Sequence, residues 1–437
     1  MFSNIRTGLL LVIVLLLVLV PAVVTAQDKV TIEVWLYDDD LGQCVSDLVT
    51  AGFNAYSETA QVNVTLQPDV YTTLGTALAG GGGPDVVPID GPVAAQQIAS
   101  AGLLLPLDGY VVSEGWDTSF VPWALELGKV DGQLYTLPDS LETLLIWYNS
   151  TLFETNGWEI PTTMDEFFAL MQTISDAGII PLANAFGDYP PAHEWLVGAF
   201  LNHYAGPEMV YEALTGQREW TDPVFLEAIT QLNTMVQNGW VDGGLDTFFT
   251  DSFDTVHAMV GSGEAAMTLE GSWFFPTQYF GAEAGNDNEF NWFPFPTSSG
   301  DEVYMTGIGA AWGINANTEH PEAAVEFLSW LFSPAAQAER LTLCGFALAP
   351  IQISADAFAE TDPRVAQIYS RYGEAAAQGN YGYTTWTFFP SPSQIYLYEQ
   401  IQNVYLGDLT PEAYLAGLAE LFAQDLADGS VPPIPAR

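Results

Sequence analysis

Basic side chains are what this chain of 437 residues has least of. Lys and Arg together number 8, against 54 Asp and Glu, so the formal net charge is -46. We therefore expect no nucleic-acid partner, because contacts to backbone phosphates need basic side chains. The same shortage disfavours an anionic small ligand. Two interpretations of the charge remain open: a solubility adaptation of an exported protein, and a site for a cationic ligand.

Long apolar runs are also scarce, and the one that occurs lies near the N-terminus. Residues 8–24 are almost wholly apolar, Arg6 precedes them, and Val24-Thr25-Ala26 offers the small residues of a cleavage site. We expect residues 1–26 to be an export signal. An uncleaved membrane anchor is the alternative, because a run of about 17 residues approaches the length of a membrane span. The sequence thus predicts a protein secreted across the cytoplasmic membrane, periplasmic or associated with the cell surface.

Cysteine is nearly absent, with Cys44 and Cys344 alone. Export permits a disulfide between them, and two separate buried thiols are the alternative. His193 and His203 are not at the spacing of metal ligands, and no Cys, His and carboxylate cluster has that spacing either. The sequence therefore predicts no metal site and no cofactor.

Apolar residues, in contrast, are plentiful enough for two domains with cores of their own. Near the N-terminus, strand patterns alternate with helical ones, which predicts a parallel α/β sheet. Ligands of such sheets lie beyond the carboxyl ends of the strands. The candidate binding residues at these ends are Trp35, Tyr37, Asp38, Asp39 and Asp90.

The stretch from Lys129 to Phe168 organises the rest of the chain. DGQLYTLP predicts a tight turn and a short strand that ends at Pro138, and LETLLIWYN predicts a buried strand. Thr163, with Glu166 three residues later, predicts a capping box that opens an amphipathic helix. This order resembles the crossover of extracellular solute-binding proteins that feed sugar importers of the ATP-binding-cassette (ABC) type.

Further segments carry the same resemblance, in the order of that family. They are GGGPDVV with ASAGLLLPLDGYV, GEAAMTLEGSW, VYMTGIGAAWGINANTEHPEAA, and GDLTPEAYLAGLAELF. Together they cover nearly the whole chain after the export signal, which makes the resemblance to maltose-binding-protein-like proteins far more specific than one motif.

The resemblance implies an α/β, two-lobed periplasmic-binding-protein fold of type II-like topology. Each lobe would be a mainly parallel sheet flanked by helices, and a hinge of three crossings would join the lobes. Residues 27–141 with 306–350 would form one lobe, and residues 142–305 with 351–437 the other.

The ligand is expected in the cleft between the lobes. Glu142 at the crossing joins the strand-end acids as an acceptor for hydroxyl groups, and aromatic rings would stack on a sugar face. The resemblance suggests these further binding residues: Tyr189, His193, Trp195, Glu270, Trp273, Gly307, Trp312, Trp386 and Phe388. For His193 a local structural role is the alternative, and for Trp273, Trp312, Trp386 and Phe388 it is core packing.

The function implied is capture of a neutral mono- or oligosaccharide and its delivery to an ABC importer. The partners would be the sugar, the permease and the ATPase, with the protein acting as a monomer and not as an enzyme. A polyamine or other cationic ligand is the alternative within the same class. A secreted glycoside hydrolase is the alternative from another class, because two carboxylates about 5 to 10 Å apart would suffice. No nucleophile-elbow or zinc-protease motif is present.

Overall fold

The computed structural model describes residues 29–68, 70–187, 189–274, 280, 287–345, 347–353 and 358–437. The expected export signal at residues 1–26 lies outside these ranges. None of the helices within them combines the length and apolarity that crossing a membrane requires.

Two separate sheets form the framework. The larger has the order β12-β11-β3-β1-β2, with β6 also paired to β11; the smaller has the order β10-β7-β9-β8. The strands of the larger sheet are β1 (Val30–Tyr37), β2 (Ala60–Gln67), β3 (Val86–Asp90), β6 (Thr136–Glu142), β11 (Tyr304–Ile314) and β12 (Tyr381–Tyr383). Those of the smaller are β7 (Leu144–Asn149), β8 (Ile180–Ala183), β9 (Ala265–Gly271) and β10 (Phe290–Pro294). A short hairpin adds β4 (Lys129–Val130) and β5 (Gln133–Leu134).

The strand directions differ from the expected mainly parallel arrangement. β1 is parallel to β2 and β3, but β11 runs antiparallel to β3 and β6. In the smaller sheet β7 is antiparallel to both neighbours, and only β8 and β9 are parallel. Both sheets are therefore mixed, with parallel and antiparallel pairs in each.

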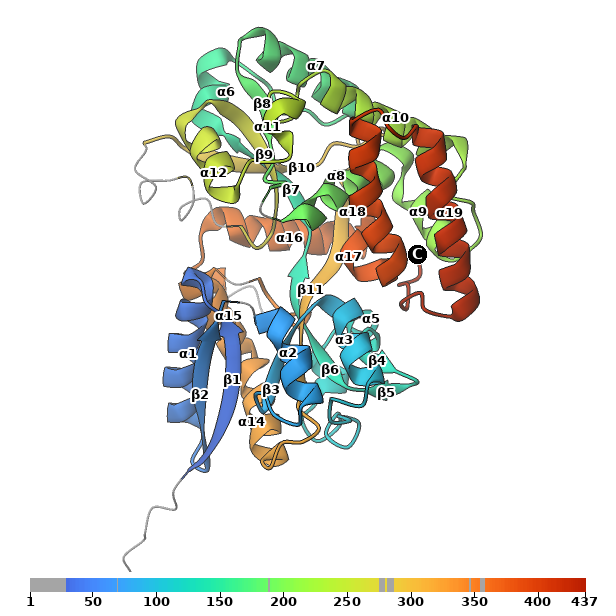
Figure 1. The fold of residues 1–437 in the computed structure, drawn as a ribbon. Helices are drawn as coiled ribbons and strands as arrows, with labels where there is room; N and C mark the ends of the chain where they lie inside the picture. The colour runs from blue at the N-terminus through green and yellow to red at the C-terminus, as the bar shows by residue number, and fades with distance from the viewer. Residues whose placement is uncertain are drawn as a thin grey trace, which may run out of the picture.

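Helices cover both sheets and divide into two groups (Figure 1). The larger-sheet lobe holds α1 (Asp40–Tyr56), α2 (Val70–Ala79), α3 (Gly91–Ser100), α4 (Trp116–Ser119), α5 (Pro122–Glu126), α14 (Pro321–Leu331) and α15 (Pro334–Cys344). The smaller-sheet lobe holds α6 (Ser150–Asn156), α7 (Met164–Asp176), α8 (His193–Ala199), α9 (Pro207–Leu214), α10 (Pro223–Gln237), α11 (Leu245–Phe248), α12 (Phe253–Ser262), α18 (Ser391–Tyr405) and α19 (Pro411–Asp428). A 3-10 helix at Pro190–Ala192 and a π-helix at Phe200–Ala205 flank α8. Helices α16 (Pro363–Ala377) and α17 (Thr385–Phe388) lie between the lobes.

Local sequence signals explain where several of these helices begin. The hydroxyl of Thr163 accepts the backbone N–H of Glu166 at 3.2 Å, and the Glu166 carboxylate accepts that of Thr163 at 3.2 Å. This confirms the predicted capping box of α7. Its Phe167, Met171 and Ile174 are fully buried, as an amphipathic helix requires. Helix α19 begins at Pro411 after Thr410, whose hydroxyl accepts the backbone N–H of Ala413 at 3.2 Å.

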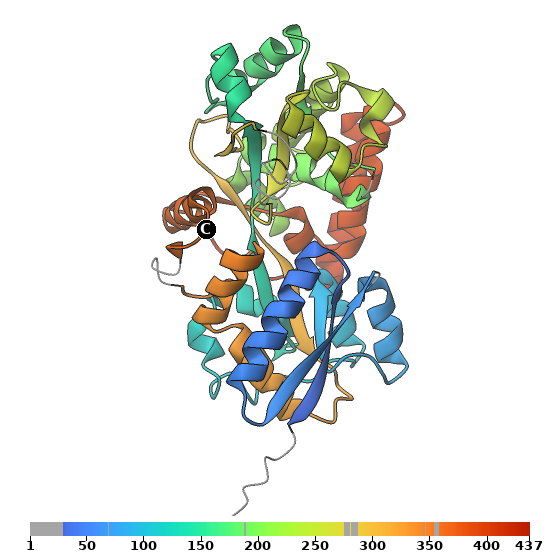
Figure 2. The ribbon, with the colours of Figure 1, turned by 90° about the vertical axis from the view of Figure 1, so that its left-hand side faces the viewer.

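The two lobes lie one above the other and are joined by strands (Figures 1 and 2). β6 ends in the larger sheet at Glu142, and β7 starts in the smaller one at Leu144. The strand was predicted to end at Pro138, but β6 continues to Glu142, and Pro138 pairs with Ala311 of β11. The first three residues of β11 pair with β12 and its remainder with β6 and β3. The division of the chain at 141/142, 305/306 and 350/351 stays a prediction.

A disulfide joins Cys44 of α1 to Cys344 at the end of α15, with their Cα atoms 5.6 Å apart. The expectation that these cysteines could be bridged is confirmed. The bond ties together two segments of the larger-sheet lobe that are 300 residues apart in sequence.

Candidate functional site

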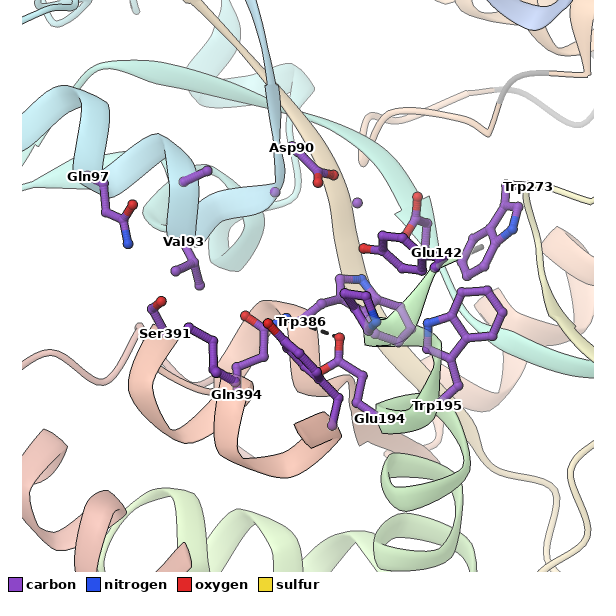
Figure 3. A pocket seen from close by; sticks show the side chains of 17 residues that line it. Asp90, Val93, Gln97, Glu142, Glu194, Trp195, Trp273, Trp386, Ser391 and Gln394 are labelled. Carbon is purple, nitrogen blue, oxygen red and sulfur yellow. Dashed lines mark hydrogen bonds between the residues drawn. The ribbon is translucent and has the colours of Figure 1, made fainter. Parts of the chain in front are cut away.

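A cavity of about 390 Å³ is lined by residues from both lobes (Figure 3). Its volume lies within the range of small-molecule sites. The lining residues are Asp90, Gly91, Val93, Ala94, Gln97, Glu142, Tyr189, Pro191, Glu194, Trp195, Trp273, Gly309, Trp386, Ser391, Gln394, Ile395 and Tyr398. They include three carboxyl groups, and no Lys, Arg or His occurs among these lining residues.

The larger-sheet lobe contributes a wall of small and polar groups. β3 ends at Asp90, and α3 starts at Gly91, whose φ of 73° lies in the left-handed region that favours glycine. The chain therefore turns sharply there and sets Val93 and Gln97 of α3 along the cavity (Figure 3). The Asp90 side chain is exposed to the cavity solvent, yet the surrounding protein raises the pKa of its carboxyl.

The smaller-sheet lobe and α17 contribute a wall of aromatic rings. The Trp195 and Trp273 rings lie 5.5 Å apart, and Trp386 meets Trp273 edge-on at 6.1 Å. Tyr189, 41% exposed, packs against Trp195 at 6.4 Å. Trp273 and Trp386 are half-buried, so parts of their rings stay open to the cavity (Figure 3). Flat faces of this kind suit an apolar ring face or a cation.

Glu142 lies where the two walls meet, at the end of β6. Ser140 donates its hydroxyl to the Glu142 carboxyl at 2.5 Å and has a left-handed φ of 51°. Gly309 lies on the neighbouring strand β11, where an added Cβ would be 1.8 Å from a carboxyl oxygen of Glu142. Glycine at 309 therefore makes the room into which the Glu142 side chain folds.

Burial raises the pKa of Glu142 to about 8, and the nearby carboxylates of Asp90 and Asp139 add to this rise. The Ser140 hydroxyl opposes it. The indole N–H of Trp386 has no partner that meets hydrogen-bond geometry, yet it lies near enough to lower the pKa of Glu142 slightly. Glu142 is thus protonated at neutral pH and can both donate and accept a hydrogen bond.

Glu194 is a second buried acid in this cavity. Its side chain on α8 is 2% exposed, and one carboxyl oxygen accepts Gln394 Nε2 at 3.0 Å. The other oxygen is buried without a partner. Burial raises the pKa of Glu194 to about 8, and Gln394 and Thr385 oppose this rise. A buried acid with a free oxygen at a cavity wall is ready to bind a polar group of a ligand.

The structure brings six of the predicted binding residues into this cavity: Asp90, Glu142, Tyr189, Trp195, Trp273 and Trp386. Their role in binding stays a prediction. Tyr37, Asp39 and Trp312 instead line a second cavity of about 280 Å³ in the larger-sheet lobe. Asp39 caps α1 there, and Trp312 donates its indole N–H to the buried Asp139 at 2.8 Å.

The remaining predicted residues lie outside the 390 Å³ cavity, for different reasons. His193 is buried and stacked on Phe186 at 4.3 Å, and burial lowers its pKa to about 3. Glu270 is buried against His257, and Phe388 is fully buried in the core. The structural alternatives stated for His193 and Phe388 agree with these positions, and no such alternative was stated for Glu270.

Two strand positions and one loop residue complete the set. Gly307 faces Thr384, whose hydroxyl would lie 2.2 Å from an added Cβ, so this glycine makes room for packing within the protein. Trp35 is half-buried and packs against Leu74, Val87 and their neighbours. Asp38 is exposed beside the cap of α1.

Sequence reasoning missed Glu194 and the whole contribution of α18. Ser391, Gln394, Ile395 and Tyr398 have the spacing of one helical face, so a signal was present. Nothing in the sequence said that this face lines a cavity rather than the surface. Glu194 lies between two predicted residues, His193 and Trp195, and the orientation of α8 brings its side chain to the cavity.

Comparison with known proteins gives relatives over much of the chain. The "Alpha-glucosides-binding periplasmic protein AglE" of Rhizobium meliloti is 27% identical over 270 residues, which are 57% of each chain. The "Multiple sugar-binding protein" of Streptococcus mutans is 24% identical over 70% of this chain and 71% of that one. This chain thus spans little more than half the length of the AglE protein.

Among solved structures, a "Chitin oligosaccharide binding protein" superposes with a TM-score of 0.74 at 23% identity, over 92% of this chain and all of that one. A likeness at this identity shows the two-lobed fold. Residues 46–338, more than half of the chain, match the family model of the bacterial extracellular solute-binding protein. The chain therefore belongs to the bacterial extracellular solute-binding proteins.

Proposed function

We propose that the protein binds a neutral mono- or oligosaccharide in the 390 Å³ cavity and delivers it to an ABC importer. One observation carries this: three tryptophans and three acids that can bond hydroxyl groups line one cavity between two lobes. The AglE protein and the multiple sugar-binding protein, whose names state sugar binding, support the ligand class. A relative from Pyrococcus horikoshii, described as an ABC transporter extracellular-binding protein, supports delivery to an importer.

The mechanism follows from the position of the cavity. A sugar ring would stack its apolar face on Trp273 or Trp386 while its hydroxyls bond Asp90, Glu142 and Glu194. Contacts to both walls favour the state in which the lobes are closed, because only that state makes all of them together. The closed form, acting as a monomer, would then be recognised by a permease and its ATPase.

Titration with a sugar panel tests the proposal. Neutral mono- and oligosaccharides are added while tryptophan fluorescence and heat of binding are followed. We expect one saturable site, and ligand at 100 times Kd should add about 2.7 kcal/mol to the free energy of unfolding. If no neutral sugar of the panel showed saturable binding, the proposal would be contradicted. Hydrolysis of a labelled oligosaccharide would instead support the glycoside hydrolase.

A cationic ligand is a second candidate, because the lining has three acids and no base among its described residues. An amine would have to take the proton of Glu142 or Glu194, because burial raises the pKa of both acids to about 8, and would then bind the carboxylate beside the aromatic rings. Spermidine and a neutral sugar can be compared on the parent and on Glu194→Gln, which keeps the shape and removes the group that could ionise. An amine site should lose at least tenfold in affinity for spermidine in the variant. A site for neutral sugar should bind no spermidine in the parent.

The localisation of the protein is also a proposal. The family is extracellular by description, and we propose that residues 1–26 direct export to the periplasm or the cell surface. Fractionation of cells that express the whole chain, with mass measurement of the exported form, tests both the place and the cleavage after Ala26.

A further inference from the structure

The loop between α10 and α12 carries acids that the proposed sugar site does not use. Hydrogen bonds join it to β8 and to the segment that follows β8. Asp242 donates its backbone N–H to Leu182 O at 2.9 Å, and Asp251 O accepts Gly187 N at 3.0 Å. The loop therefore closes on the carboxyl end of β8, in the smaller-sheet lobe (Figure 1). Neither acid lines the sugar cavity.

These acids line a cavity of about 580 Å³ that holds carboxyl groups at two depths. Asp242 and Asp251 are 3% and 9% exposed. Asp246 and Glu264 line the same cavity and are exposed. No Lys, Arg or His is among the lining residues that the structure describes. The cavity therefore combines two buried acids with two exposed ones and no compensating positive charge.

Each of the two buried acids has one carboxyl oxygen without a hydrogen-bond partner. Asp242 Oδ1 accepts the backbone N–H of Asn184 at 2.6 Å, but its Oδ2 is buried without a hydrogen-bond partner. Asp251 Oδ2 is likewise buried and unpartnered. Burial, with a further contribution from Asp251, raises the pKa of Asp242 well above its usual range. Buried acceptors of this kind need a donor, a water or a cation.

The backbone around these acids is constrained as well. Asp242 has a φ of 51°, and Gly243 and Gly244 follow with 72° and 123°. Left-handed conformation at a residue other than glycine is uncommon and persists only where the surroundings impose it. Thr247 donates its hydroxyl to Asp242 O at 3.0 Å, while Asp251 N donates to Thr247 O at 3.1 Å. Thr247 thus connects the two acidic ends of the loop.

We propose that this loop binds a calcium ion between Asp242 and Asp251. The described part of the chain gathers no three His, Cys, Asp or Glu side chains into a ready metal centre, so two carboxylates alone would anchor the ion. Ca²⁺ suits such a site because it takes six to eight oxygens in irregular geometry, including carbonyls and waters. Zn²⁺ would prefer His or Cys, which this lining lacks among its described residues.

The ion would neutralise the two buried carboxylates and fasten the loop to the end of β8. With so few charged ligands, we expect a Kd on the order of 10⁻⁴ to 10⁻³ M, the range of extracellular calcium modules. The competing explanation is that Asp242 and Asp251 share a proton and bind no metal.

The test uses the whole exported chain after dialysis against a chelator. CaCl₂ is added while thermal unfolding and heat of binding are measured, with NaCl of equal ionic strength and MgCl₂ as references. We expect a saturable rise in Tm with one Ca²⁺ per chain, larger than that with Mg²⁺. Asp242→Asn and Asp251→Asn should each weaken Ca²⁺ binding at least tenfold. Asp176→Asn, which removes an exposed acid of the same lobe, should leave it unchanged.

A readout on the parent protein covers the case in which a variant does not fold. Trp240, 8% exposed, precedes Asp242 by two residues and should sensitise the luminescence of Tb³⁺ bound at the loop. Ca²⁺ should displace that signal over the same concentration range as the Tm shift. A Tm that responds equally to Ca²⁺ and to NaCl would overturn the proposal. So would calcium binding that is equal in the parent and in both Asp variants, because it would then reflect the general acidity of the surface.

Discussion

The two walls of the 390 Å³ cavity carry different kinds of side chain. The larger-sheet lobe offers short and polar side chains around Asp90 and the start of α3, where glycine lets the backbone turn. The smaller-sheet lobe and α17 offer the rings of Trp195, Trp273 and Trp386. One wall is therefore suited to hydrogen bonds with ligand edges, whereas the other combines contact with ligand faces and the polar groups of Glu194, Ser391 and Gln394.

The difference also shows where binding energy should concentrate. Buried aromatic anchors dominate binding energies, while single hydrogen bonds contribute modestly because they replace bonds to water. The lobe with the polar wall is held by the Cys44–Cys344 disulfide, and the lobe with the aromatic wall packs a large aromatic core. We thus expect stability and affinity to respond to different substitutions, and the following experiments separate them.

Removal of the disulfide should have the largest effect, and on stability alone. Cys44→Ala with Cys344→Ala releases a loop of 300 residues in the unfolded chain and should lower the free energy of unfolding by about 4 kcal/mol. Urea unfolding measures this change. Sugar affinity of the folded variant should stay within twofold, because the bond lies outside the cavity lining. A larger loss of affinity would mean that the polar wall depends on the bond.

Truncation of a side chain in the aromatic wall should lower affinity for the sugar more than it lowers stability. Trp273→Ala should weaken sugar binding by about 2 kcal/mol, roughly thirtyfold, as the loss of a buried anchor does. Trp147→Ala is the matched control, because Trp147 is fully buried in the neighbouring strand β7. That variant should lose about 3 to 5 kcal/mol of stability.

The pair of variants decides the role of Trp273. Melting without ligand and titration with sugar are measured on both. If Trp273→Ala melts as low as Trp147→Ala and binds sugar as the parent does, Trp273 belongs to the core and not to the site.

The sequence predicted those parts of the molecule that depend on neighbouring residues. The capping box at Thr163 and Glu166 needs only four consecutive residues to form. The match of several segments to one family predicted the two-lobed fold. The disulfide stayed open, since its formation depends on a packing of α1 against α15 that no local signal specifies.

The site could be predicted only to within one helical turn. On α8, Trp195 and Glu194 line the cavity while His193 stacks in the core, and on α17 Trp386 lines it while Phe388 is buried. Residues two apart on a helix point to nearly opposite sides, so the choice depends on how each short helix is rotated. Tertiary packing sets that rotation, as where His193 stacks on Phe186, and the sequence carries no separate signal for it.

The buried acid of the aromatic wall should make stability depend on pH. The pKa of Glu194 is raised from 4.5 to about 8, so between these values the folded protein holds a proton that the unfolded chain has lost. Stability is retained below about pH 4.5 and falls as pH rises toward 8, by at most about 1.4 kcal/mol per pH unit. Glu194→Gln removes this contribution, while that of Glu142, whose pKa is also raised to about 8, remains in both proteins.

We therefore expect the free energy of unfolding of Glu194→Gln, relative to that of the parent, to rise by at least about 1 kcal/mol between pH 5 and pH 8 without ligand. Urea unfolding at both pH values measures the difference. Glu154→Gln, at an exposed position on α6, is the control and should follow the parent. Parallel behaviour of all three proteins would show that Glu194 is ionised at neutral pH.

The smallest effect is expected at the polar wall. Gln97 is exposed on α3 and lines the cavity, whereas the adjacent Gln96 lies outside the lining. Gln97→Ala should therefore weaken sugar binding by about 1 kcal/mol, the net contribution of one hydrogen bond. Gln96→Ala, the same change one residue earlier, should leave affinity unchanged, and both variants should keep their stability within about 0.5 kcal/mol. Calorimetric titration compares the two. A loss at Gln97 as large as that at Trp273 would mean that the ligand depends on the polar wall as much as on the rings, and the contrast between the walls would then fail.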